Sequence, residues 1–152
     1  MPAVTGAWDE PAVETFLEDA VVPIRLACST GQGLWMLSLW FDYDGGRLRC
    51  ATAADADVVS FLRRDPETAF EVSTNEPPYR GVRGAGRARV EPDEDKAVLE
   101  TLYDRYLDDP DREAPLADVL FAPDREEARI VIEPRRLHSW DYSERMGPAV
   151  ER

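Results

Sequence analysis

A chain of 152 residues with 31 acidic and 18 basic side chains carries a formal charge of -13. This length can bury a core of its own without disulfides or metals to hold it. The composition argues against nucleic-acid binding, which needs clustered cations, and no apolar run reaches the ~20 residues of a membrane span. Because no basic-then-apolar signal pattern opens the sequence, we expect a single cytoplasmic domain over residues 1–152.

Abundant acids, retained arginines and a lone lysine, Lys96, are typical of proteins that work in a salt-filled cytosol. We therefore expect a halophilic protein whose acidity is a solvent adaptation. Cys28 and Cys50 stand outside any CxxC motif and away from any histidine cluster. We expect them to be buried thiols rather than metal ligands or a redox pair.

The first predicted elements are a helix and a strand. Asp9 is the expected N-cap of the helix. The apolar stripe of this helix consists of Val13, Phe16, Leu17 and Ala20. Residues 22–30 then alternate as a strand, and the Gly-Gln-Gly sequence at 31–33 turns the chain into the next strand.

The strand predicted over residues 34–43 is apolar on both faces, with Ser38 at its centre. A strand in a two-layer sheet alternates apolar and polar residues, so both faces of this one must be covered. The core of a barrel would cover one face, and a partner subunit, a flat ligand or both would cover the other. The Asp-Gly-Gly sequence at 44–46 predicts a tight hairpin turn into a returning strand over 47–52.

The middle of the chain predicts a short helix over 56–64, a strand over 68–74 and, after a proline break, a strand over 82–90. A long helix is predicted over 92–107, with Pro92 and three acids in its first turn. The apolar face of this helix consists of Val98, Leu99, Leu102, Tyr103 and Tyr106.

The last predicted elements are an acidic loop over 108–112, a short helix over 116–121 and a long strand over 128–142 that bends at Pro134. The sequence after this strand is polar.

Six predicted strands, joined mostly by tight turns, indicate a mainly β fold. We expect a small antiparallel β-barrel with peripheral helices. The barrel core would span residues 22–142, an N-terminal helix would occupy 1–21, and a tail would occupy 143–152.

The sequence does not fit the common motifs for catalytic or nucleotide-binding sites. His138 is the only histidine and no nucleophile elbow accompanies it, so a Ser-His-Asp triad is not expected. The Gly-Ala-Gly sequence at 84–86 lies within a strand rather than before a helix, so it does not fit a dinucleotide-binding loop. The carboxylate pairs at 108–109 and 126–127 are expected to be solvated surface. We predict no catalytic residue and no metal site from these patterns.

Several segments, in this order, carry a resemblance to a known family. They are IRLACSTGQGLWMLSLWF, RLRCAT, FLRRDP, PPYRGVRGAGRARV and RLHSWDY. Over about residues 23–142 the chain resembles the pyridoxamine 5'-phosphate oxidase-like FMN-binding split-barrel proteins. The resemblance implies a six-stranded antiparallel split barrel that forms a homodimer. It also implies that FMN, or in some branches a deazaflavin or haem, binds in a groove between the two subunits.

The resemblance further implies where the cofactor binds. The segment that lines the isoalloxazine ring matches Leu37, Ser38, Leu39 and Trp40. The strand end that reaches the ring edge or the ribityl phosphate matches Ala51 and Thr52. Val58 stands where the family usually has a phosphate-binding lysine, so another cation must take that role.

A flavin phosphate carries close to two negative charges and needs cations or hydrogen-bond donors. The candidate replacements for the lysine are Arg25, Arg63, Arg64, Arg80, Arg83 and Arg87. Arg80 is favoured because the glycines that follow it let a ligand approach the backbone, whereas Arg63 and Arg64 fit a solvated helix end. The predicted cofactor-binding residues are Arg25, Leu37, Ser38, Leu39, Trp40, Ala51, Thr52, Arg80 and Gly81.

Together these observations favour an FMN-binding oxidoreductase in which the flavin exchanges two electrons with a small substrate or a nicotinamide. Pyridoxamine phosphate oxidase activity itself is less favoured, because basic residues for two phosphates are not evident. The alternative is a non-catalytic module that binds flavin, deazaflavin or haem on the same dimeric barrel, which Val58 favours. A third alternative, an oligonucleotide-binding barrel, conflicts with the acidity of the chain.

Overall fold

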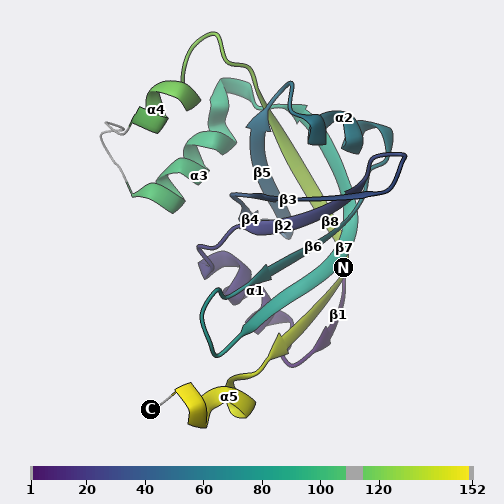
Figure 1. The fold of residues 1–152 in the computed structure, drawn as a ribbon, viewed down its shortest axis with the longest axis vertical. Helices are drawn as coiled ribbons and strands as arrows, with labels where there is room; N and C mark the ends of the chain where they lie inside the picture. The colour runs from purple at the N-terminus through teal and green to yellow at the C-terminus, as the bar shows by residue number, and fades with distance from the viewer. Residues whose placement is uncertain (1, 109–114, 151–152) are drawn as a thin grey trace.

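The computed structural model describes residues 2–108 and 115–150, and its strands form one sheet (Figure 1). The strand order is β3-β2-β6-β7-β8-β5-β4, and β1 lies parallel to β8 outside this path. The strands are β1 (Ala3–Gly6), β2 (Ile24–Ser29), β3 (Leu34–Leu39), β4 (Asp42–Asp44), β5 (Arg47–Ala53), β6 (Glu67–Ser73), β7 (Arg80–Pro92) and β8 (Glu127–Asp141). The helices are α1 (Glu10–Asp19), α2 (Asp57–Arg64), the 3-10 helix η1 (Glu94–Lys96), α3 (Ala97–Leu107), α4 (Pro115–Leu120) and α5 (Ser143–Val150).

The two edge strands of the sheet, β3 and β4, follow each other directly in the chain. Only Trp40 and Phe41 separate them, so the two edges meet and the sheet curls into a barrel. The hydroxyl of Tyr106 on α3 holds this link, because it accepts a hydrogen bond from the Phe41 amide at 3.1 Å and donates one to the Val22 carbonyl at 2.8 Å.

The interior of the barrel comes from the alternation of its strands. Ile24, Leu26 and Cys28 on β2 are buried, and the residues between them are only half-buried. Helix α1 adds Val13 and Leu17 to the same core, which confirms two members of its predicted apolar stripe. The core therefore lies inside the barrel and under α1.

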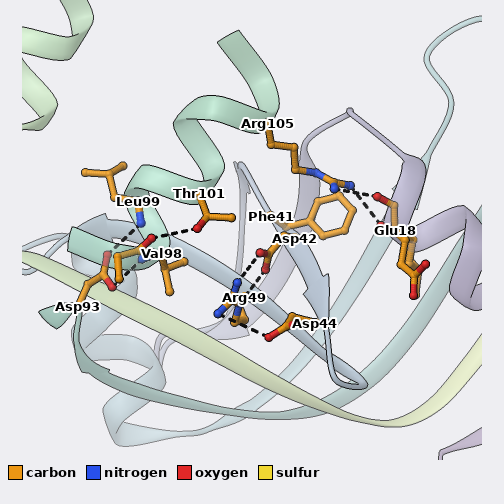
Figure 2. Close-up of polar contacts among 12 residues, drawn as sticks. Glu18, Phe41, Asp42, Asp44, Arg49, Asp93, Val98, Leu99, Thr101 and Arg105 are labelled. Atoms are coloured by element: carbon orange, nitrogen blue, oxygen red, sulfur yellow. Dashed lines mark hydrogen bonds and ion pairs between the residues drawn. The ribbon is translucent and has the colours of Figure 1, made fainter. Parts of the chain in front are cut away.

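Polar side chains hold both ends of α1. The carboxylate of Asp9 accepts a hydrogen bond from the first turn at 3.1 Å, which confirms the predicted N-cap. At the other end, Arg105 on α3 donates to the carbonyls of Leu17, Glu18 and Ala20, which the helix leaves without partners (Figure 2). Helix α3 therefore fastens the end of α1.

The long helix begins later than the sequence predicts. Strand β7 runs on to Pro92, η1 follows, and α3 begins at Ala97, so Pro92 is not in the first helical turn. Asp93 is buried instead, and its carboxylate accepts hydrogen bonds from the amides of Val98 and Leu99, both at 3.0 Å (Figure 2). A single acid placed before the helix satisfies two of its free amides.

Other predictions about the elements are corrected as well. The sequence predicts no strand before α1, yet β1 pairs with β8, and the strand predicted over 34–43 is two strands, β3 and β4. The tail over 143–152 contains α5. The predicted bend at Pro134 is confirmed, because the pairing of β7 with β8 shifts its register opposite this residue.

Strand β3 is the least covered part of the barrel. Leu34, Trp35 and Met36 are 84%, 51% and 66% exposed. Leu37 and Leu39 of the same strand pack against the core, so the predicted cover for the remaining apolar side chains, a partner subunit or a flat ligand, stays a prediction. Exposed apolar side chains on an edge strand are a surface that can pair with another molecule.

The described residues contain no helix that is long and apolar enough to cross a membrane, and no cluster of histidine, cysteine and acidic residues that could hold a metal ion. Cys28 and Cys50 are buried free thiols, as predicted. Burial raises the pKa of both thiols, which keeps them protonated and unreactive.

Candidate functional site

A cavity of about 360 Å³ opens beside the link between the two edges of the sheet. Its walls come from the ends of β3 and β5 on one side, and from α3, α4 and the start of β8 on the other. Five residues predicted to bind the cofactor line it: Ser38, Leu39, Trp40, Ala51 and Thr52. The volume lies within the range of about 300–1,000 Å³ that is usual for small-molecule sites.

The pairing of β5 with β8 sets one wall of this cavity. Thr52 pairs with Ala128, and Ala53 pairs with Glu127, the first residue of β8. The chain then leaves the sheet and enters α2, so the Thr52 side chain stands at a strand end. The hydroxyls of Ser38 and Thr52 make no hydrogen bond with any described residue, so both can bind a ligand.

Trp40 forms a fixed wall of the cavity. Its ring stacks on Tyr106, with the ring centroids 5.3 Å apart and the planes at 11°, and meets the edge of Tyr103 at 6.4 Å. Because Tyr106 covers one face of the indole, only the remainder of the ring can contact a ligand. The ring position is set by α3 rather than by the ligand.

Arg125 and Glu127 line the same cavity, and neither is among the residues predicted to bind the cofactor. The expectation that Glu127 is solvated surface is wrong, because its side chain is only 1% exposed. Its Oε1 accepts a hydrogen bond from Nε of Arg125 at 3.1 Å, and its Oε2 is buried without a partner. Burial raises the pKa of Glu127, and the Arg125 guanidinium opposes that shift.

One signal in the sequence could have pointed to this pair. Glu127 directly precedes the apolar residues of a strand that is buried on both faces over most of its first half. An acid at such a place must find a partner, because a buried carboxylate is costly unless a cation or donors balance it. Arg125 and Arg129, each two positions away, are the nearest cations in the sequence.

A second cavity, of about 640 Å³, adjoins the first and shares Arg125 and Glu127 with it. Arg63 and Lys96 also line this second cavity. Val58, at the position of the family lysine, is 3% exposed and belongs to the barrel core. A cation for this region therefore comes from another part of the chain.

Arg25 is not among the residues that line the cavity with Thr52, although it pairs with Ser38, which is. Arg25 lines a cavity of about 410 Å³ together with Arg83, Arg136 and His138. Its Nη1 donates to the carbonyl of Pro23, a residue that lines the 360 Å³ cavity, at 2.8 Å. Leu37 is also apart from the 360 Å³ cavity, because it packs against the barrel core.

Arg80 and Gly81 lie at the opposite end of β8 from Thr52. Arg80 pairs with Asp141 at the last residue of β8, whereas Thr52 pairs with Ala128 near its first residue. At about 3.3 Å per residue, these positions are about 40 Å apart along the strand. Arg80 lines a different cavity, of about 740 Å³, beside α1. One chain therefore does not bring Arg80 and Thr52 to the same ligand.

No family model matches the sequence, and no curated protein matches it. The structure, in contrast, is similar to solved structures over most of its length. The conserved hypothetical protein Rv2991 from Mycobacterium tuberculosis has a TM-score of 0.73 and 23% sequence identity, over 93% of this chain and 90% of that one. An F420 reductase has a TM-score of 0.61 and 26% identity, over 80% of this chain and 92% of that one.

A candidate pyridoxamine 5'-phosphate oxidase from Listeria innocua has a TM-score of 0.65 and 17% identity, over 86% of this chain and 96% of that one. Proteins described as FAD-binding and as haem-binding also have similar structures. Similarity at this level establishes the fold and leaves the activity to the site. The chain therefore has the split-barrel fold of the pyridoxamine 5'-phosphate oxidase-like proteins, as the sequence resemblance predicts.

Proposed function

We propose that this protein is a homodimeric flavoprotein that binds FMN in the 360 Å³ cavity and serves as an oxidoreductase. The observation that carries the proposal is the convergence of Ser38, Leu39, Trp40, Ala51 and Thr52 on one cavity, although they come from β3, from the link after it and from β5. The split-barrel fold adds support, since flavin-binding proteins are among the similar structures.

The residues present fit a flavin nucleotide. Leu39, Trp40 and Leu116 offer apolar surface for a flat ring, and the free hydroxyls of Ser38 and Thr52 offer hydrogen bonds to its polar edge. When bound, the flavin supplies two-electron chemistry, and the protein supplies orientation, hydrogen bonds and exclusion of water. A small substrate or a reduced nicotinamide would be the partner of that exchange.

The dimer is supported by the exposed edge strand. Leu34, Trp35 and Met36 are apolar and mostly exposed on β3, whose end also forms a wall of the cavity. A second copy of the chain on this edge would cover these side chains and close the cavity from the outside. Arg80 and Gly81 would contact the same flavin only if they came from that second copy.

A deazaflavin is the second candidate ligand, because an F420 reductase is among the similar structures at 26% identity. Haem fits the cavity less well. His138, the only histidine, lines a different cavity, and both cysteines are buried in the core. A non-catalytic flavin carrier is the functional alternative, and the absence of a lysine at position 58 favours it.

The experiment is an absorption and fluorescence titration of the purified protein with FMN, carried out in molar potassium chloride because we expect a salt-adapted protein. Binding should shift the flavin spectrum and quench flavin emission, and addition of reduced nicotinamide without oxygen should bleach the bound flavin. If added FMN keeps the fluorescence of free FMN at every protein concentration, the proposal is wrong. Tight binding without bleaching by any reduced nicotinamide would favour the carrier.

A further inference from the structure

We propose that Arg125 binds the phosphate of the flavin nucleotide, in the role that the lysine at position 58 cannot take, and that Glu127 positions its guanidinium. This inference rests on the proposed FMN binding and names the residue that would select the phosphorylated ligand. Arg125 lies in the turn between α4 and β8, and none of the cofactor-binding residues predicted from the sequence lies in this turn.

The placement of Arg125 is the first argument. Arg125 lines the 360 Å³ cavity and its two neighbours, of about 640 and 270 Å³. Several acidic residues line each of the two neighbours, so the phosphate would bind in the 360 Å³ cavity, where Glu127 is the one acid among the lining residues. A ring seated against Leu39 and Trp40 would direct its ribityl chain past Thr52 toward this guanidinium, since Thr52 and Arg125 line the same cavity. The cation thus lies where the anionic end of the ligand would leave the sheet.

The free hydrogen-bonding capacity of Arg125 is the second argument. Its Nε donates to Glu127 Oε1 at 3.1 Å, and no described residue accepts from its two terminal nitrogens. The side chain is 28% exposed, so these nitrogens can reach a ligand. Two terminal nitrogens in a planar fork match the spacing of two phosphate oxygens.

The burial of Glu127 is the third argument. Its side chain is 1% exposed, and it binds Nε of Arg125, which leaves the two terminal nitrogens without a partner among the described residues. Its Oε2 has no partner, and the other charged groups that act on it are Asp93 and Lys96. A carboxylate oxygen only accepts hydrogen bonds, so Glu127 positions Arg125 and does not itself contact the phosphate.

The turn that carries Arg125 is fixed by its backbone. The Nζ of Lys96 donates to the carbonyls of Leu120 and Ala122, at 3.1 and 2.7 Å. The Glu126 carbonyl accepts from the Ala54 amide at 3.0 Å, which ties the turn to the end of β5. Lys96, the only lysine of the chain, therefore binds backbone carbonyls rather than a ligand. These hydrogen bonds stabilise the turn that carries Arg125.

The other arginines are less suited to this position. Arg63 is on the exposed last turn of α2 and lines only the 640 Å³ cavity, while Arg25 and Arg80 line cavities that do not contain Thr52. Arg125 is the cation that shares a cavity with Thr52 among the described residues.

The test compares FMN with riboflavin, which has the same ring and ribityl chain but no phosphate. Wild-type protein should bind FMN more tightly than riboflavin, and Arg125→Gln should lower the FMN affinity by about 10- to 100-fold while leaving that for riboflavin within about twofold. The matched control is Arg129→Gln. Arg129 is 32% exposed and also donates to a glutamate at 3.1 Å, but it lines none of these cavities. This control should bind both flavins as the wild type does.

Two variants of Glu127 separate positioning from simple structural support. Glu127→Gln keeps an acceptor for Arg125 and removes the compensating charge, so FMN affinity should stay equal or rise a few-fold. Glu127→Ala removes the acceptor, so the preference for FMN over riboflavin should fall. Should Arg125→Gln fail to fold, Arg125→Lys tests the same point, because a point charge without the fork should retain only part of the preference.

The outcomes are distinguishable. A wild-type protein that binds neither flavin overturns the proposed function and this inference with it. A wild-type protein that prefers FMN, together with an Arg125→Gln variant that keeps the full preference, overturns the inference and leaves the proposed function standing. Equal losses in Arg125→Gln and Arg129→Gln would also overturn it, since the effect would then be one of overall charge.

Discussion

Strand β8 has two ends with different surroundings. At its start it pairs with β5, and the buried carboxylate of Glu127 holds Arg125 in a cavity that also contains Thr52. At its end it pairs with β1, and Arg136 and His138 stand exposed on the surface of another cavity. Both ends are rich in arginine. The difference shows that a cation becomes a candidate ligand-binding residue when a buried partner fixes it beside a cavity, and not by its residue type alone.

The largest expected effect is on the oligomeric state, because only a dimer could bring the two ends of β8 to one flavin. Met36→Glu places a charge on the exposed apolar edge of β3, where a second copy would bring it next to its own equivalent or to apolar surface. We expect the variant to sediment as a monomer where the wild type sediments as a dimer. Val21→Glu is the control, since Val21 is apolar and 53% exposed but lies outside β3. A wild type that sediments as a monomer would contradict the dimer proposal, and a Met36→Glu variant that remains a dimer would contradict an interface on β3.

The next effect tests how much the Asp93 carboxylate stabilises the start of α3, the helix that lies beside the cavity at the start of β8. Asp93→Ala removes the acceptor of two buried amides, those of Val98 and Leu99, and should lower the free energy of unfolding by about 2 kcal/mol. Glu94→Ala, at an exposed neighbour, should change it by less than about 0.5 kcal/mol. Urea denaturation of both variants measures the difference. Equal changes would mean that the Asp93 hydrogen bonds contribute little.

A smaller effect is expected on FMN affinity, and it compares residues at the two ends of β8. Thr52→Val keeps the shape of the side chain and removes its hydroxyl, so the FMN affinity should fall by about fivefold to tenfold through loss of one hydrogen bond. Arg80→Gln, at the opposite end of β8, should change it by less than twofold. Fluorescence titration gives both values. A large loss in Arg80→Gln would show instead that the two ends of β8 contribute to one flavin from different subunits.

The smallest effect is a pH dependence of the free energy of unfolding that arises from Glu127. Burial raises the pKa of this carboxyl above its ordinary value of 4.5, so the folded protein binds the proton more tightly than the unfolded chain does. The stability that this group contributes is present below about pH 4.5 and is lost as the pH rises through the folded-state value. Glu127→Gln should therefore be more stable than the wild type at pH 8, by a margin that shrinks at pH 5. Urea denaturation at both pH values checks this, and a constant margin would argue against it.

The sequence predicts the strands and the capping of α1 because these depend on local patterns. Alternation on β2 and an aspartate before α1 are visible within a few residues. The break at Trp40 and Phe41 is not visible, because both residues continue an apolar run and only the meeting of two sheet edges divides it. Strand β1 is also not visible in the sequence, because it is four residues long and its partner, β8, lies near the other end of the chain.

The candidate site divides in the same way. Ser38 and Thr52 are found through a family resemblance, and the structure brings them to one cavity. Arg80 is chosen for its neighbouring glycines, but the register of β7 against β8 places it far from Thr52, and register is not readable from one strand. Glu127 is predicted to be surface because an acid beside another acid usually is, and its burial depends on tertiary packing that the local sequence does not show.

The hydroxyl of Tyr106 also bears on the order of folding. The residues that it joins, Val22 and Phe41, precede it by 84 and 65 positions in the sequence. The barrel therefore cannot lock its seam until a ribosome has released α3, and until then β3 and β4 remain two open sheet edges. Contacts between segments so distant in sequence slow folding and leave the edges available for aggregation. Because these contacts form late, a Tyr106→Phe variant should unfold faster than the wild type while its refolding rate changes little.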